Sequence, residues 1–254
     1  MKRRHIQHIR VHFARSISVC ALSVLAGCTA SLPVYPTEPV SESLAILAAR
    51  VEDIETLSGA GRLTVQNISG DTLTLQVAIV AQPPERLRLR AWKLSQSIAD
   101  VTIIDGQIWV DLSDDLKTMV DQAETDEIQI IAELLTPEFF RTAVEDIPAT
   151  ASTLWIRGVG LDGQTLRCEV NRPTLSPRRW EVIPESFDGL AAKSDPILVV
   201  LLDRYHVIED SIWPMRVRAT GASGFAELRF DWVELNKQLS PGAFKYPRTA
   251  TKYP

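Results

Sequence analysis

The chain has 254 residues, 23% of them charged, and a formal net charge of −5. Its apolar content of 45% is enough to build a sizeable core, which excludes a largely disordered chain. Residues 1–27 hold five basic and no acidic residues, so the remainder carries a charge of −10. Phosphate binding depends on Lys and Arg, so we expect no nucleic-acid partner for this acidic chain.

The first 27 residues have the layout of an export signal. Residues 1–15 are basic, and residues 16–26 form an apolar run that is too short to span a bilayer. The run ends in Leu25-Ala26-Gly27-Cys28, a cysteine directly after small residues. This stretch resembles the lipobox of bacterial lipoproteins, which implies cleavage after residue 27 and a diacylglyceryl group on the thiol of Cys28. The alternative is an ordinary signal that is cleaved at another position.

The lipobox resemblance also implies a location. Several acyl chains together anchor a protein stably, because each buried CH₂ group contributes about 0.8 kcal/mol. In enterobacterial lipoproteins an Asp after the cysteine favours the inner membrane, whereas Thr29 follows it here. We therefore expect a protein that is lipid-anchored to the outer membrane on its periplasmic side. Residues 28–40 would then hold the lipidated cysteine and a proline-rich tether, and residues 41–254 the folded domain.

The chain beyond the signal is poor in residues for enzyme chemistry. Cys168 is its only cysteine besides Cys28, and His206 is its only histidine. Neither a two-His metal site nor a Cys/His zinc site can be built from these residues. The sequence contains no nucleophile elbow and no glycine-rich phosphate loop. We expect a protein that is not an enzyme and uses no cofactor; catalysis by His206 is the weakest alternative.

The spacing of apolar residues predicts a helix followed by strands. Residues 41–57 repeat apolar side chains at helical spacing, which indicates an amphipathic helix. From Gly61 the period switches to two, which indicates antiparallel strands with one buried face. Asp105-Gly106 marks a two-residue hairpin turn. Strands are expected from residue 61 and at 72–79, 86–91, 101–104, 107–110, 116–120, 152–159, 164–171, 179–184, 197–208, 211–220 and 225–235.

Residues 125–144 interrupt the strands with a helical insert that is rich in large apolar groups. These groups are Ile131, Leu134, Leu135, Phe139 and Phe140. They form either a lid over an acyl-chain cavity or plain core between helix and sheet, because a ligand cavity and a filled one have the same sequence signature. The order of elements favours a mainly β fold, in which helices cover the concave side of a single, strongly curved antiparallel sheet. The polar tail after residue 235 is expected on the surface.

Several short motifs carry a resemblance to a family. The first helix runs into Leu57-Ser-Gly-Ala-Gly-Arg-Leu63, and Pro84 precedes an Arg-rich strand. Trp213-Pro214 opens a late strand, and residues 236–244 form an "Asn…Phe" closing segment. These features resemble the LolA/LolB-like group of bacterial cell-envelope proteins. The resemblance implies an incomplete antiparallel barrel of about eleven strands with helices over a hydrophobic cavity, and the lipobox favours the anchored LolB side.

The family resemblance also implies a site. LolB-type receptors use a protruding leucine between the third and fourth strands, and here residues 93–97 contain Leu94. Leu94 would insert into the membrane or help deliver a lipid-modified client; alternatively it packs at the sheet edge. Trp92 either lines the concave face or serves as core or edge packing. The implied function is binding of acyl chains or another apolar envelope ligand, as in a lipoprotein receptor. The alternative is an assembly lipoprotein that pairs its sheet edge with an envelope protein and carries no lipid.

Overall fold

The computed structural model describes residues 31–114, 137–160, 163–184 and 195–253. Helix α1 spans Val40–Glu52 and helix α4 spans Pro137–Thr142. The strands are β1 Leu57–Asn67, β2 Thr72–Gln82, β3 Arg86–Lys93, β4 Gln96–Ile104, β5 Gln107–Leu112, β6 Val144–Ile147, β7 Thr153–Val159, β8 Thr165–Asn171, β9 Ser176–Ile183, β10 Leu198–Ile208, β11 Ser211–Gly221, β12 Gly224–Leu235 and β13 Thr251–Tyr253.

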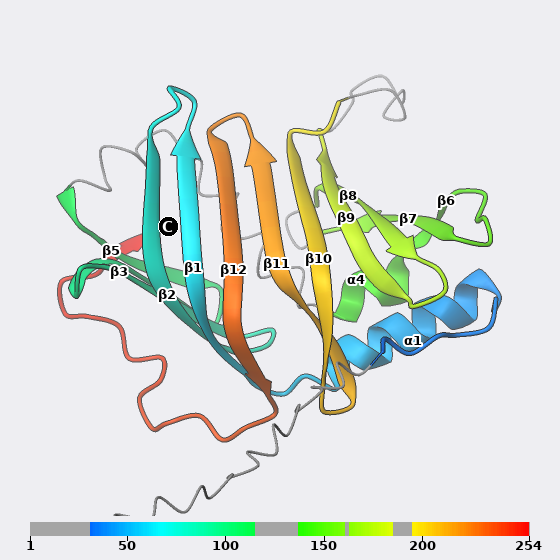
Figure 1. Ribbon diagram of the computed structural model, residues 1–254, viewed down its shortest axis with the longest axis horizontal. Helices are drawn as coiled ribbons and strands as arrows, with labels where there is room; N and C mark the ends of the chain where they lie inside the picture. Colours follow the sequence, from blue (N-terminus) through cyan, green and yellow to red (C-terminus); the bar gives the residue numbers. More distant parts are fainter. Residues whose placement is uncertain (1–30, 115–136, 161–162, 185–194, 254) are drawn as a thin grey trace, which may run out of the picture.

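These strands form a single antiparallel sheet in the order β13-β5-β4-β3-β2-β1-β12-β11-β10-β9-β8-β7-β6. The sheet is strongly curved, and α1 and α4 lie against one face of it, beside β7–β10 (Figure 1). The expected mainly β fold with one curved antiparallel sheet and helices is therefore confirmed. In the described part of the chain, no helix is long and apolar enough to cross a membrane.

The largest core lies between the two helices and the strands β7–β10. α1 contributes Leu44 and Leu47, and α4 contributes Phe139 and Phe140. Both phenylalanine rings pack on Trp180 of β9, with ring centroids 4.5 and 5.6 Å away. Alternate residues of the strands complete this core because successive side chains of a strand point to opposite faces. Cys168 is buried here, as its place on an apolar strand face predicts.

The junction between helix and sheet differs from the prediction. α1 ends at Glu52, and β1 begins at Leu57 rather than at Gly61. The earlier start results from tertiary contacts. Leu57 pairs with Leu235 of β12 on one side and with Ala81 of β2 on the other, so β1 extends toward its N-terminus as far as both neighbouring strands reach. At Gly61 the β12 backbone comes so close that an added Cβ would lie 2.0 Å from the carbonyl oxygen of Arg229.

The strand count is thirteen in the described residues, against about eleven expected. Two short edge strands, β6 and β13, have four and three residues and are too short to carry a readable alternation. β13 forms because the C-terminal tail returns to β5, where Lys252 pairs with Trp109. The predicted strand at 116–120 and most of the helical insert lie outside the described residues.

The tail also covers the outer face of β3–β5. Arg88 donates a hydrogen bond to the carbonyl oxygen of Ala243 at 3.1 Å, and Tyr246 stacks on Trp109 with centroids 4.2 Å apart. Beneath the tail, Arg88 makes two hydrogen bonds to Asp100, at 2.8 and 2.6 Å. The Arg-rich face of β3 is therefore partly closed by the chain itself.

Candidate functional site

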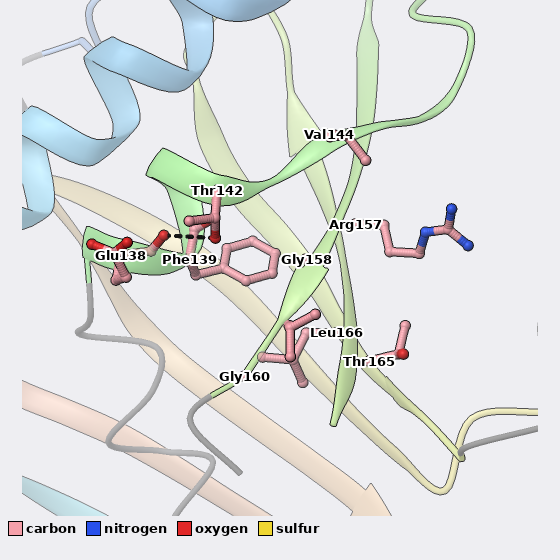
Figure 2. Close-up of a pocket in the computed structure, with 10 residues that line it drawn as sticks. Glu138, Phe139, Thr142, Val144, Arg157, Gly158, Gly160, Thr165 and Leu166 are labelled. Atoms are coloured by element: carbon pink, nitrogen blue, oxygen red, sulfur yellow. Dashed lines mark hydrogen bonds between the residues drawn. The ribbon is translucent and has the colours of Figure 1, made fainter. Parts of the chain in front are cut away.

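A cavity of about 610 Å³ lies beside α4 at the end of the β7–β8 hairpin (Figure 2). We call it the α4 cavity. Its apolar lining comes from Phe139, Val144, Val159 and Leu166, with Gly158 and Thr142 between them. Pockets for small ligands typically measure about 300–1,000 Å³ and are mostly apolar. The size and the lining are therefore those of a site for an apolar group.

Phe139 takes its place in this cavity because Gly158 leaves room for it. A Cβ on Gly158 would lie 2.8 Å from the Phe139 ring, closer than carbon atoms pack. The short α4 turn is held by the Ala143 amide, which donates to the carbonyl oxygen of Phe139 at 2.9 Å. Thr142 donates to the carbonyl oxygen of Glu138 at 3.0 Å (Figure 2). The ring lines the cavity and at the same time packs on Trp180 in the core.

Two charged residues, Glu138 and Arg157, line the α4 cavity, and each is ion-paired. Arg141 bridges Glu52 of α1 and Glu138 of α4, at 2.6 and 3.5 Å. The hydrogen bond and attraction from Glu52 raise the pKa of Arg141, and Glu138 adds to the effect. On the other side of the cavity, Arg157 lies 3.5 Å from Asp146 of β6. An apolar floor with both charge signs at the rim suits a chain-like apolar ligand with a polar end.

Two further clusters of apolar side chains, partly buried and partly core, lie along the central strands. These strands run away from α1 and α4 (Figure 1). Leu63 of β1 stands opposite Leu75 of β2 and Leu228 of β12, which places all three on one face. The partly buried apolar residues of this face include Leu63, Leu73, Leu87, Leu89, Trp213, Met215 and Leu228. The concave side of the sheet is therefore apolar well beyond the region that α1 and α4 cover.

Leu94 protrudes from the molecule. It forms a two-residue turn with Ser95 between β3 and β4, and its side chain is 96% exposed. Both residues have positive φ, 49° and 68°, a conformation that disfavours a side chain such as leucine. With 96% of its side chain exposed, Leu94 does not pack at the sheet edge. Its role in membrane or client binding stays a prediction.

The other predicted ligand-binding residues are dispersed. Phe139 lines the α4 cavity, and Phe140 lies behind it, 1% exposed. Trp92 lies beside Arg90, whose guanidinium sits 4.9 Å from the ring centroid, rather than in the α4 cavity or the two further apolar clusters. Cys28, Ile131, Leu134 and Leu135 lie outside the described residues.

Sequence reasoning missed Gly158 and Leu166 as part of the cavity. An isolated glycine inside a strand pattern often marks the close approach of another group, and Gly158 is such a glycine in β7. That signal could have found the position, although it could not have named Phe139 as the group that approaches. Leu166 carries no separate signal, because it reads as one more inward-facing strand residue.

The described residues offer little to reaction chemistry. Within them, no three His, Cys, Asp or Glu side chains gather as they would around a metal ion. Burial raises the pKa of the Cys168 thiol well above its ordinary value, the opposite of what a reactive thiolate needs. His206 is exposed on β10.

A scan against protein-family models and a search of curated proteins find no match to this sequence. Among solved structures, a LolA superfamily protein from Nitrosomonas europaea aligns with a TM-score of 0.56 at 11% identity, over 80% of this chain and 97% of that one. The chain has a LolA-like fold. The sequence-based expectation of this fold is thereby confirmed, on an alignment that covers nearly the whole of the related chain.

Two further structures share the LolA-like fold with this chain. A DUF1329 family protein from Desulfovibrio piger aligns with a TM-score of 0.59 at 11% identity, over 83% of this chain and 98% of that one. An outer membrane lipoprotein-sorting protein domain from Vibrio parahaemolyticus gives 0.55 at 10% identity, over 82% and 97%. At such identities the likeness establishes the LolA-like architecture alone.

Proposed function

We propose that this LolA-like protein is a bacterial lipoprotein without enzymatic activity. It is anchored through Cys28 to the periplasmic side of the outer membrane and binds the acyl chains of a lipid-modified client. The observation that carries the proposal is the apolar concave side of the sheet, with the α4 cavity of about 610 Å³ at one end. The lipobox-like Leu25-Ala26-Gly27-Cys28 supports the anchor.

Burial of apolar surface supplies the driving force for such binding. Each Å² of apolar surface removed from water contributes about 25 cal/mol, so an acyl chain is strongly favoured inside an apolar cavity over periplasmic water. Release then requires a competing apolar environment, which the membrane itself provides.

Leu94 supplies a second contact with the bilayer in this proposal. A single leucine that moves from water into an apolar environment contributes about 1.5–3 kcal/mol. That amount is enough for transient insertion and too small for permanent anchoring. The protruding turn can therefore dip into the membrane and leave it again.

Native mass spectrometry of the chain from residue 28, with Cys28→Ala and expressed with lipids present, tests acyl binding. We expect a co-purified lipid whose amount falls when Phe139→Leu alters the cavity lining. Phe140→Leu is the matched control, since Phe140 packs on the same Trp180 without lining the cavity. A protein that carries no lipid in either form would overturn the acyl-binding proposal.

The anchor has its own test. Labelled palmitate supplied to bacteria that make the full chain should enter the wild-type protein and be absent from the Cys28→Ala variant. Fractionation of the membranes by density should place the labelled protein with the outer membrane. Label that persists after the Cys28→Ala change would contradict this assignment.

A second candidate function, binding of an envelope protein without lipid, is favoured by the edge strand β6. β6 lies at the end of the sheet and exposes Val144 and Ile147, at 56% and 45%. Exposed edge strands recruit partner strands through backbone hydrogen bonds. Crosslinking in intact cells tests this function. One stoichiometric partner of a lipid-free protein, lost in an Ile147→Lys variant that leaves the α4 cavity unchanged, would favour it over acyl binding.

A further inference from the structure

The segment ahead of α1 is fastened to the domain. The Tyr35 amide donates to the carbonyl oxygen of Pro173 at 2.7 Å, in the turn between β8 and β9. Arg172 in the same turn donates to the carbonyl oxygen of Glu38 at 2.8 Å. Before these contacts the chain runs along a cavity of about 450 Å³ that Leu32 helps to line. The described part of the expected proline-rich tether thus lies against the domain at Leu32, Tyr35 and Glu38.

This attachment limits how far the domain can stand from its anchor. Leu32 is four residues from Cys28. A fully extended chain covers at most about 3.5 Å per residue, so the two residues are within about 14 Å of each other. If Cys28 carries the lipid, as proposed above, the cavity beside Leu32 is therefore within reach of the lipid headgroups.

The cavity beside Leu32, which we call the tether pocket, is rich in arginine. It lies beside the start of β9 and the middle of β10 and is lined by Arg178, Arg204 and Arg218, with Asp203 as its only acidic residue. Ser176 and Thr174 add hydroxyl groups to the lining. Phosphate groups are recognised in proteins by guanidinium groups together with such hydroxyl donors.

The acidic residues near the tether pocket are already paired. Asp203 accepts two hydrogen bonds from Arg216, both at 2.6 Å, and a third from Arg218 at 3.0 Å. Glu227, opposite Arg218 on the neighbouring strand, lies 2.5 Å from Arg229. The negative charges of Asp203 and Glu227 are therefore offset by Arg216, Arg218 and Arg229.

Three guanidinium groups at the tether pocket retain binding capacity. Arg178 and Arg204 are exposed and make no ion pair with any residue in the described ranges. The Nε atom of Arg218 is buried and has no hydrogen-bond partner among the described residues. An unpartnered buried donor is costly, and a bound anion would satisfy it.

From these observations we infer that the tether pocket binds a phosphate group, and that its ligand is the headgroup of an anionic phospholipid in the anchoring membrane. Arg178 and Arg204 hold the phosphate oxygens from the exposed side, while Arg218 closes the site from below. The inference rests on the proposed anchor at Cys28 for the choice of a lipid over free phosphate. Headgroup binding would fix the orientation of the domain on the membrane.

Vesicle flotation with the anchor-free chain tests the site apart from the anchor. The chain from residue 28 with Cys28→Ala keeps every described residue and is mixed with phosphatidylcholine vesicles, with or without phosphatidylglycerol. We expect binding to the phosphatidylglycerol vesicles. A charge near an anionic surface is worth about fivefold in binding, so Arg178→Gln/Arg204→Gln should weaken binding roughly 30-fold.

Arg62→Gln/Arg248→Gln is the matched control, because it removes two exposed arginines that line neither cavity. An equal loss of vesicle binding in this control would show that the vesicles attract exposed arginines anywhere on the chain, and would overturn the proposed site. Calorimetry with inorganic phosphate separates the two sources of the ligand. Phosphate binding that depends on Arg178 and Arg204, without vesicle binding, would overturn the lipid assignment. Failure of palmitate labelling at Cys28 would contradict the proposed anchor. The vesicle experiment tests headgroup binding in the tether pocket separately, because it uses a chain without the anchor.

Discussion

Arg50 of α1 donates a hydrogen bond to the hydroxyl oxygen of Tyr35 at 2.9 Å, and its guanidinium carbon lies 5.5 Å from the centroid of that ring. The same guanidinium donates to the carbonyl oxygen of Leu175 at 2.6 Å, in the turn that enters β9. One side chain thereby joins the segment ahead of the helix to the turn between β8 and β9. The segment that holds Tyr35 is fixed to the domain through this contact.

We predict that Arg50→Ala detaches the segment that holds Tyr35. Hydrogen bonds to a charged group contribute about 1.5–3 kcal/mol each, so the free energy of unfolding should fall by at least about 2 kcal/mol. Hydrogen exchange should show faster exchange of the Tyr35 amide. Tyr35→Phe is the control: it removes one hydrogen bond and should cost about 1 kcal/mol. Unchanged protection at Tyr35 in the Arg50 variant would contradict the assigned contact.

We predict that Leu94 lowers the stability of the folded protein while its exposed side chain serves the proposed function. Asparagine tolerates positive φ better than leucine does, so Leu94→Asn should raise the free energy of unfolding by about 1 kcal/mol. No packing is lost, because the leucine side chain is 96% exposed. Urea unfolding measures the gain. Leu94→Ala removes the apolar group and keeps the unfavourable φ, so it should reduce transfer of acyl-bearing clients to membranes without any gain in stability.

The close approach of β1 and β12 should make Gly61 intolerant of any side chain. A Cβ at this position would overlap the carbonyl oxygen of Arg229, and the backbone cannot swing away as a side chain can. Gly61→Ala should therefore destabilise the protein by about 3 kcal/mol or more. At Gly59 the nearest atoms are 3.1–3.3 Å from an added Cβ, so Gly59→Ala should cost less. Equal unfolding free energies for the two variants would contradict this ordering.

Asp203 gives the protein a defined acid sensitivity. The hydrogen bond from Arg216, together with the attraction of both arginines, lowers the pKa of Asp203 below its ordinary value of 3.8. A lowered folded-state pKa means that the stabilisation is fully present above pH 3.8 and is lost as the pH falls through the folded-state value. Asp203→Asn should be less stable by about 1 kcal/mol at neutral pH. Its free energy of unfolding, measured across the acid range, should also fall less steeply than that of the wild type.

The candidate site was only partly predictable from the sequence. Phe139 belongs to a conspicuously apolar stretch, and it does line the α4 cavity. Phe140 has the same sequence signal yet is core, because successive residues of the short helix face different neighbours. The tether pocket has no sequence signal at all, since Leu32, Arg178 and Arg218 come from distant parts of the chain.

The sequence by itself determined the features that depend on neighbouring residues, namely the strands and the tight turns. Alternating apolar residues define the strands, and Asp105-Gly106 forms the predicted turn with φ values of 50° and 74°. The order of these elements predicted the mainly β architecture, and the short motifs carried the resemblance to LolA-like proteins. Each of these features depends on residues that are close together in the chain, so their pattern can be read directly.

Contacts between distant segments were decided only by the tertiary structure. Leu57 pairs with Leu235, so the start of β1 depends on a strand near the other end of the chain. The tail covers Arg88 and adds β13, and Arg172 holds Glu38, although none of these residues has a local preference for its partner. Such contacts arise because the folded sheet brings unpaired backbone groups and charges within reach of one another. Hydropathy patterns carry no record of that proximity.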